Sequence, residues 1–533
     1  MDMSNFVGEF EMNVPTTVQT VCTDITATEE IGRDFVLPDY QPEIRKVLRL
    51  TPSVRPPSRF LGTDEAEFSG NVGFDLLYIG GDGGLYSASL SAPYSFRMPL
   101  AGSDRMSGDR PMCADAEITA VSSHCRLSAP RKLHIGCHLR ARLVGLCDEQ
   151  TDVRGLGGAD TERLERTVTV GRCADVTGEA MELTDEIPVS GEGELRLIGA
   201  EGAVHVSEAA VGEDGVACRG ELYLKVMVTR DPMPQGEESP SAGRGEVEVL
   251  TRRLPFSQTI GLDAPVGREE CRAAVCGSCT DVHVRVEEDR LLCAVSVVLQ
   301  ARAQGNEKVT FIRDCYAVDR PTVCEMRSYA PRRGICCVNG NVTSGGTVEG
   351  AQAGIPSRAV PLDVSGSAAV TEISCERGHA VLTGEGTYRL LYRTAEGEIG
   401  HAEFTLPLRY ELPDGGLDPS LRLGADARMT MISGRARVEG DGSYTVDAEW
   451  TVSARIYAQD RIEAVDEVRA EGDAVPSSDA CVICYPAAGE TLWRVAKRYR
   501  TPLRTLAVMN DLPGSSDADS PQSLQGVHFL MIG

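Results

Sequence analysis

This chain of 533 residues has no long apolar run, few aromatic residues and fewer basic than acidic residues. The longest apolar run, Leu291–Leu299, contains Cys293 and Ser296 and is far shorter than the roughly 20 residues that a membrane helix needs. Lys and Arg number 53 against 79 Asp and Glu, which gives a formal charge of −26. Because binding to phosphate backbones needs a basic surface, this composition argues against general nucleic-acid binding.

Motifs of the common enzyme classes are also missing. The sequence contains no phosphate-binding loop, nucleophile elbow or zinc-protease motif, and nothing selects two of its many carboxylates as an acid and base pair. We therefore expect no catalytic residues, no enzymatic activity and no cofactor. The first ten residues have neither a basic region nor an apolar stretch, so we expect a soluble protein that stays in the compartment where it is made.

Eighteen cysteines are present, and without an export signal they are expected to be reduced thiols, most of them buried as small apolar residues. Cys276–Cys279 and Cys481–Cys484 have C-x-x-C spacing. A structural zinc ion needs four ligands, and Cys271 with His283 could complete the first pair. The favoured alternative is that His283 lies on one face of a strand, so we expect no metal site.

Alternating apolar and polar residues fill most of the chain, as in Lys132–Gly145, Asp281–Glu288 and Ser443–Ala458. This period of two, interrupted by turns rich in Gly and Asp, indicates antiparallel sheets with one solvated face. The exception before residue 485 is a short segment that begins at Pro42, in which Ile44, Val47 and Leu48 have helical spacing. It predicts a short helix that covers a sheet, with a docking edge as the alternative.

The chain contains three copies of one pattern, in which a Gly precedes a Tyr or Val by eight positions and a Pro follows. The copies are Gly70, Tyr78 and Pro93; Gly220, Val228 and Pro255; and Gly384, Tyr392 and Pro407. The middle copy has 12 extra residues, Met233–Arg244, with the composition of an exposed loop. Each copy reads as a β-hairpin that is followed by a further pair of strands.

Three related β-sandwich-like domains follow from these repeats, because a sheet with one apolar face must cover it. The expected limits are residues 1–150, 151–306 and 307–470. A polar linker, residues 471–480, leads to a fourth unit at residues 481–533. The predicted fold is therefore mainly β, with three related domains and a small C-terminal β-α-α-β unit.

The C-terminal unit has its own pattern. A short strand near Val482 precedes a helix within Gly489–Tyr499, which Glu490 or Thr491 caps and whose apolar face is Leu492, Val495, Ala496 and Tyr499. A second helix has Thr501 as its N-cap and ends near Asn510. A final apolar run, Val527–Ile532, predicts the closing strand. Residues 1–482 carry 48 basic and 75 acidic residues, whereas the remainder has a charge of about +1.

This order of motifs, with G-E-T-L-W-x-V-A-K-R-Y followed by T-P-L-x-x-L and N-D-L, resembles a LysM domain. The resemblance implies a glycan groove between Gly489–Leu492 and the loop after Asn510, although the loop Pro513–Ser523 is longer than usual in that family. The residues that it places at a partner-binding or glycan-binding site are Gly489, Glu490, Thr491, Leu492, Trp493, Arg494, Lys497, Arg498, Asn510 and Leu512.

The repeats resemble SPOCS domains through L-P-D-Y-Q-P-E-I-R-K-V-L in the first copy, the spacing of the hairpins, and L-P-F-S-Q-T-I in the second. Three such domains before one LysM domain resemble the SpoVID/SipL group of spore-coat morphogenetic proteins. The resemblance implies an adaptor in the mother-cell cytoplasm at the forespore surface and in the spore coat. Its implied partners are the basement-layer ATPase of the coat and other coat proteins.

Two functions from different classes remain open at this point. The first is a structural adaptor that binds the coat ATPase through its LysM domain, with Arg494, Lys497 and Arg498 as a basic face and Trp493 as an aromatic contact. The alternative for Trp493 is packing against the linker or the last strand. The second function is an anchor that binds peptidoglycan, its precursors or other N-acetylglucosamine glycans.

Overall fold

A computed structural model describes most of the chain. The described residues are 17–62, 65–100, 112–155, 161–191, 193–231, 246–263, 269–288, 290–440, 442–473, 481–512, 518–520 and 522–533. Met233–Arg244, which we predicted to be an exposed loop, lies outside them. So do most of the predicted linker and residues 513–517 and 521 of the long C-terminal loop. The structure is mainly β, as the alternating pattern predicted.

The first repeat folds as a sandwich of two antiparallel sheets. One sheet has the strand order β1-β7-β6, and in the other β4 pairs with β2, β3 and β5. The strands are β1 (Thr17–Val36), β2 (Ile44–Val54), β3 (Ser58–Leu61), β4 (Glu65–Gly80), β5 (Leu85–Pro99), β6 (Met112–Ala129) and β7 (Lys132–Gln150). Their inward side chains form one core, which includes Phe74, Tyr78 and Leu139.

The second and third repeats use the same connectivity. In each, the first strand pairs with the last, the last with the one before it, and the middle three strands pair with one another. In the third repeat, one pairing of Ser367 on β18 with Thr430 on β21 also joins these two groups of three strands into one sheet. The second sandwich contains β10 (Thr177–Pro188), β11 (Glu194–Gly212), β12 (Gly215–Asp231), β13 (Glu246–Ile260), β14 (Glu269–Val286) and β15 (Arg290–Ala317). The third contains β17 (Arg332–Glu349), β18 (Val360–Glu376), β19 (His379–Arg393), β20 (Ile399–Glu411), β21 (Leu423–Val438) and β22 (Ser443–Gln459).

The repeated Gly-to-Pro pattern corresponds to one conserved register. The residue after the repeated Gly pairs with the repeated Pro in all three hairpins: Asn71 with Pro93, Glu221 with Pro255, and Glu385 with Pro407. The Pro lies on the outer strand of each hairpin, where a missing N–H disrupts no further pairing. A Cβ atom at Gly220 or Gly384 would lie 2.0 or 2.1 Å from a carbonyl oxygen of the neighbouring strand, so only Gly fits.

The predicted helix after Pro42 is wrong, because the chain enters strand β2 at Ile44. Two β-bulges, between Ile44 and Lys46 and between Val47 and Arg49, each insert an extra residue into the pairing with β4. A bulge lengthens the spacing between inward side chains beyond two. Buried positions therefore recur at Ile44 and Leu48, which imitates the period of a helix.

A narrow arm extends from the three sandwiches. It comprises β8 (Arg154–Gly155), β9 (Thr161–Cys173), β16 (Thr322–Tyr329), β23 (Ile462–Ala470) and the second half of β15. Strand β15 is continuous through the expected domain boundary at residues 306 and 307. It pairs with β10 up to Ala301 and with β9 from Gln304 onward. Its 28 residues thus belong both to the second sandwich and to the arm.

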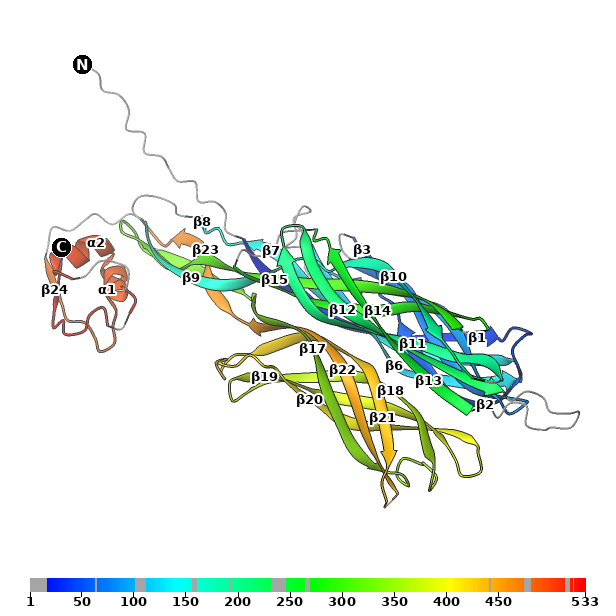
Figure 1. The fold of residues 1–533 in the computed structure, drawn as a ribbon. Coiled ribbons are helices and arrows are strands. Elements are labelled where there is room, and N and C mark those ends of the chain that lie inside the picture. The colour runs from blue at the N-terminus through cyan, green and yellow to red at the C-terminus, as the bar shows by residue number, and fades with distance from the viewer. Residues whose placement is uncertain are drawn as a thin grey trace, which may run out of the picture.

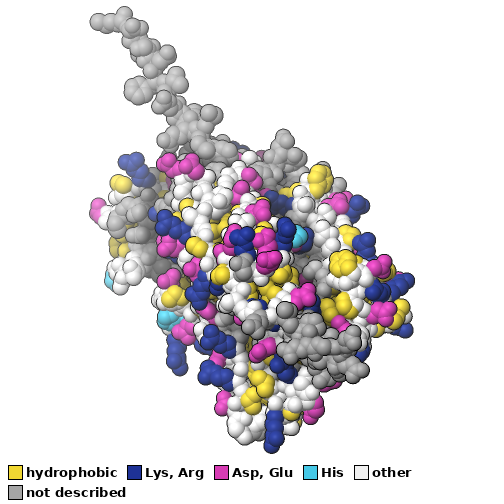
Figure 2. Space-filling model, turned by 45° about the vertical axis from the view of Figure 1, so that its right-hand side comes forward, with side chains coloured by type: hydrophobic (Ala, Val, Ile, Leu, Met, Phe, Trp, Pro, Cys, Tyr) yellow, Lys and Arg dark blue, Asp and Glu magenta, His cyan; other side chains and the backbone are white. Residues whose placement is uncertain are grey.

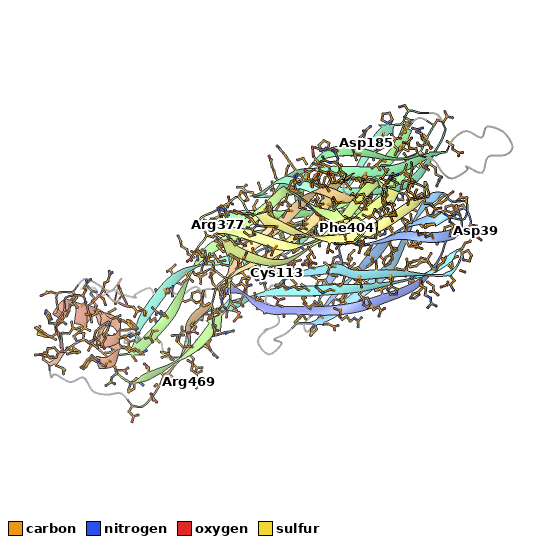
Figure 3. All side chains as sticks on the ribbon, turned by 90° about the horizontal axis from the view of Figure 1, so that it is seen from below. Asp39, Cys113, Asp185, Arg377, Phe404 and Arg469 are labelled. Atoms are coloured by element: carbon orange, nitrogen blue, oxygen red, sulfur yellow. The ribbon has the colours of Figure 1, made fainter. Side chains whose placement is uncertain are left out.

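The C-terminal module, residues 481–533, lies at the far end of the arm (Figure 1). It contains strand β24 (Val482–Cys484), helices α1 (Leu492–Tyr499) and α2 (Leu503–Met509), and strand β25 (Leu530–Ile532), which pairs with β24. Figure 3 shows Arg469 on the arm next to this module, whereas Asp39 and Asp185 mark the opposite end of the molecule. The module is therefore remote from the body of the three sandwiches.

Candidate functional site

Helix α1 carries most of the residues that the sequence placed at a binding site. Thr491 caps it by accepting a hydrogen bond from the Arg494 N–H at 3.3 Å, and Arg500 ends it in the left-handed conformation. Leu492, Val495 and Ala496 form its buried face. Helix α1 is thus amphipathic, although Tyr499, which has the same helical spacing, is exposed.

Trp493 is only 2% exposed, because the module packs against the tip of the arm. Its ring lies 5.1 Å from that of Tyr316 on β15, edge to face, and its Nε1–H donates to Asp314 Oδ2 at 2.9 Å. The Tyr316 hydroxyl in turn donates to the Thr501 carbonyl at 2.7 Å. Trp493 therefore packs on strand β15 of the arm.

Charged groups add to this contact. Lys497 forms an ion pair with Asp314, Arg313 forms one with Asp519, and the Leu503 N–H donates to the Glu162 carboxylate at 3.3 Å. Arg498 instead pairs with Glu490 inside the module at 3.0 Å. Of the predicted basic face, Lys497 thus contributes to a contact within the chain, whereas Arg494 is exposed.

Two of the remaining predicted site residues contact the long loop. Leu492 N–H donates to Ser523 Oγ at 3.1 Å, and Trp493 N–H donates to the Ala518 carbonyl at 3.0 Å. The described part of the long loop is thus hydrogen-bonded to the start of α1, where the other edge of a glycan groove would lie. Gly489 is exposed, and Leu512 is half-buried against the module core.

Asn510 has a structural role. Its side-chain N–H₂ donates to the carbonyls of Leu506 and Met531 at 2.9 and 2.8 Å, and its oxygen accepts from the Met531 N–H at 2.7 Å. These bonds join the end of α2 to strand β25 and use most of the bonding capacity of the amide. The side chain is thereby committed to holding the module together.

The outer face of the module's two-stranded sheet is apolar and exposed. Ile483 on β24 pairs with Met531 on β25, while their neighbours Cys484 and Leu530 point into the core. Tyr485 and Phe529 extend the same face by one alternation. Their exposed fractions are 57% for Ile483, 40% for Met531, 74% for Tyr485 and 51% for Phe529. We call these four residues the sheet patch; contiguous apolar surface of this kind is typical of binding surfaces.

A second cluster, which the sequence analysis did not identify, lies where the three sandwiches meet. Arg49 of the first sandwich lies 2.9 Å from Glu201 of the second, and Lys225 lies 3.1 Å from Glu201 and 3.0 Å from Asp363 of the third. Burial lowers the pKa of Lys225, but the Glu201 and Asp363 carboxylates raise it above its usual value. Two cations and two anions thus balance in this junction.

The junction is built from equivalent positions of the repeats. Leu77, Met227 and Leu391 each precede the repeated Tyr or Val by one position, and all three are buried in one cluster. A second equivalence lies in the last strand of each sandwich, where Ala-Arg recurs with Arg142, Arg302 and Arg455. This recurring dipeptide was visible in the sequence, and one of its arginines, Arg302, makes a contact between sandwiches.

These arginines bind carboxylates differently. Arg302 reaches Asp115 of the first sandwich at 2.6 Å, whereas Arg455 and Arg142 bind Asp426 and Asp24 of their own sandwiches at 2.7 and 2.8 Å. The three arginines occupy the same place in the repeat but have two roles. The ion pair of Arg302 links two sandwiches, whereas those of Arg455 and Arg142 stabilise strands within one sandwich.

A hollow of about 2020 Å³ lies between the sandwiches next to the junction, and side chains of all three line it. Acidic and basic groups face it together, among them Glu117, Arg428 and Arg435. Figure 2 shows the same mixing of both signs over one face of the molecule. Mixed charge at this density selects no single class of ligand.

Comparisons of the chain with protein-family models, with curated proteins and with solved structures found no match. Within the described residues, no helix is long and apolar enough to cross a membrane. The same part of the chain contains no group of three or more His, Cys, Asp or Glu side chains arranged to hold a metal ion.

Proposed function

We propose that this protein is a non-enzymatic adaptor of spore-coat assembly, which binds the basement-layer ATPase of the coat through its C-terminal module and tethers the coat to the forespore surface. The observation that carries the proposal is the sheet patch. Four large apolar side chains share one exposed face of a module that is remote from the body. Such a surface suits a protein partner that presents its own apolar patch.

The contacts of Trp493 and Lys497 move the proposed docking surface away from α1. A residue that is 2% exposed and hydrogen-bonded within the chain is covered in this arrangement. The sheet patch lies on β24 and β25, whose outer face is exposed. The partner surface is therefore assigned to Ile483, Tyr485, Phe529 and Met531, with Arg494 as a nearby exposed cation.

The alternative function, binding of N-acetylglucosamine glycans, has less support. It requires an open groove between the start of α1 and the loop after Asn510. The hydrogen bonds from Leu492 to Ser523 and from Trp493 to Ala518 join these two edges.

Two phenylalanines offer a matched test in the full-length chain. Phe529 lies in the sheet patch, and Phe60 on β3 is 70% exposed on the first sandwich. We expect Phe529→Ala to weaken binding to the purified coat ATPase by tenfold or more, about 1.4 kcal/mol, because buried aromatic contacts dominate such interfaces. Phe60→Ala should leave binding unchanged. Isothermal titration calorimetry with the purified coat ATPase measures both affinities.

Equal affinities for wild type and Phe529→Ala would refute the sheet patch as the docking surface. Binding of chitin oligomers by the wild-type chain, without binding of the coat ATPase, would replace the adaptor with the glycan anchor.

A further inference from the structure

The tip of the arm contains two thiols in contact. The sulfur atoms of Cys315 on β15 and Cys324 on β16 are 3.5 Å apart. Nine positions separate these residues, and the chain turns back on itself between them. Cys315 is buried beside Val465 and Val468 of β23, whereas Cys324 is only half-buried. Cys324 is thus the more exposed residue of the pair.

We propose that Cys315 and Cys324 form a redox-active thiol pair, which closes to a disulfide when it meets a low-molecular-weight disulfide such as oxidised glutathione. The sulfur atoms need to approach by about 1.5 Å to reach the bond length of a disulfide, roughly 2.05 Å. They lie on consecutive strands of two different sheets, with only residues 318–321 between the strands, so rotation of the two side chains can supply this movement.

The surroundings of the pair activate the Cys324 thiol. A hydrogen bond from the Cys315 thiol stabilises the thiolate of Cys324 and lowers its pKa, and the Lys497 ammonium acts in the same direction. Burial and the Asp314 carboxylate oppose this effect. The same hydrogen bond raises the pKa of Cys315, which therefore keeps its proton. The thiolate is the form that attacks a disulfide.

The reaction is a balanced thiol–disulfide exchange. The Cys324 thiolate attacks one sulfur of oxidised glutathione, the glutathione S–S bond breaks, and one glutathione leaves as a thiolate. Cys315 then loses its proton and attacks Cys324 Sγ of the mixed disulfide, which expels the second glutathione. The two protein thiols lose two electrons and two protons, and oxidised glutathione gains both to become two glutathiones.

The position of the pair gives the reaction a structural target. Asp314 and Tyr316, the neighbours of Cys315, are the residues that hold Trp493 and Thr501 of the C-terminal module. Cys324 Sγ also lies 3.9 Å from Asp314 Oδ1. Closing the disulfide therefore joins β15 to β16 directly behind the surface on which the module rests.

Digestion offers a direct test, because Pro321 follows Arg320 and prevents tryptic cleavage there. Trypsin thus releases both thiols in one peptide, Asp314–Arg327, which contains no other cysteine. The reduced full-length chain is incubated with oxidised glutathione, alkylated, digested and analysed by mass spectrometry. We expect this peptide to become lighter by two hydrogen atoms and to resist alkylation. Two thiols that remain alkylatable, or a stable glutathione adduct on Cys324, would overturn the proposal.

Two substitutions at the buried position separate activation from bond formation. Cys315→Ser and Cys315→Ala both prevent the disulfide, and both should leave Cys324 glutathionylated. Only Ser retains a hydrogen-bond donor for the Cys324 thiolate. We expect alkylation of Cys324 at neutral pH to be several-fold slower in Cys315→Ala than in Cys315→Ser. Equal rates would show that Cys315 does not activate Cys324 and would overturn this assignment. Circular dichroism confirms that both variants are folded.

Discussion

The chain has two tryptophans, and they lie in two different kinds of interior. Trp450 is fully buried in the third sandwich, where it packs edge to face on Tyr388 and donates to Ser344 Oγ at 2.8 Å. Trp493 is almost as buried, but its contacts with Tyr316 and Asp314 join the C-terminal module to the arm. The first belongs to one folding unit, whereas the second lies between two units.

This difference shows what a periodic pattern can and cannot establish. Alternation along Ser443–Ala458 places Trp450 on the apolar face of its own strand, so its burial follows from its own sequence. Trp493 lies off the apolar stripe of α1, and its own helix leaves it free to face either solvent or another unit. The residue that covers it, Tyr316, is 177 positions away. No local pattern encodes such a contact.

Replacing each tryptophan by alanine is the strongest test of this contrast. Trp450→Ala should destabilise the third sandwich by about 3–5 kcal/mol, because a large cavity opens in a packed core. Trp493→Ala should leave the sandwiches as stable as in the wild type and should increase amide hydrogen exchange at Thr161–Arg166 and Phe311–Ala317, where the module rests. Denaturant unfolding and hydrogen-exchange mass spectrometry measure the two effects. A loss of sandwich stability in Trp493→Ala would contradict the conclusion that Trp493 stabilises only the contact between the module and the arm.

The junction between the sandwiches gives a second test. Asp363→Asn removes one of two carboxylates that face Arg49 and Lys225, and leaves these buried cations with Glu201 alone. The expected cost is about 3–5 kcal/mol, as for other broken buried ion pairs. The control is Arg437→Ala, which removes an exposed pair with Asp447 and should cost less than about 1 kcal/mol. Urea unfolding of the full chain compares them, and equal midpoints would contradict a stabilising junction.

Lowering the pH should destabilise the three sandwiches through protonation of Asp115, with a smaller effect than the two core and junction substitutions. Burial raises the pKa of Asp115, but the charge and hydrogen bond of Arg302 outweigh it, so that the pKa falls from 3.8 to about 2. A carboxyl with a depressed folded-state pKa stabilises the fold above its unfolded-state pKa and loses this contribution as the pH falls through the folded value. About 2 kcal/mol should therefore disappear between pH 4 and pH 2.

Asp115→Asn provides the control for this effect. The variant should be less stable than the wild type at neutral pH but should lose less further stability in acid, as measured by urea midpoints across the same pH range. Parallel midpoint curves for the two proteins would exclude Asp115 as the acid-sensitive group.

The strands and the three hairpins could be predicted from the sequence because their information is local. The period of two reflects alternation within one strand. The Gly-to-Pro spacing reflects the pairing of two adjacent strands in one hairpin. The predicted helix at Ile44–Leu48 failed where two β-bulges changed that period. The positions of Arg49, Glu201 and Asp363 could not be combined from sequence, since they meet only through the packing of three sandwiches.

The continuity of strand β15 has a mechanical consequence. With 28 residues it extends for roughly 90 Å, and it presents Asp314 and Tyr316 to the C-terminal module at one end while the other end lies in the second sandwich. Antiparallel hydrogen bonds run perpendicular to the strands, so tension along β15 loads its bonds to β9, β10 and β14 in shear, many at once. A force applied through the contact with the C-terminal module is therefore shared among many hydrogen bonds along β15 rather than concentrated on one of them.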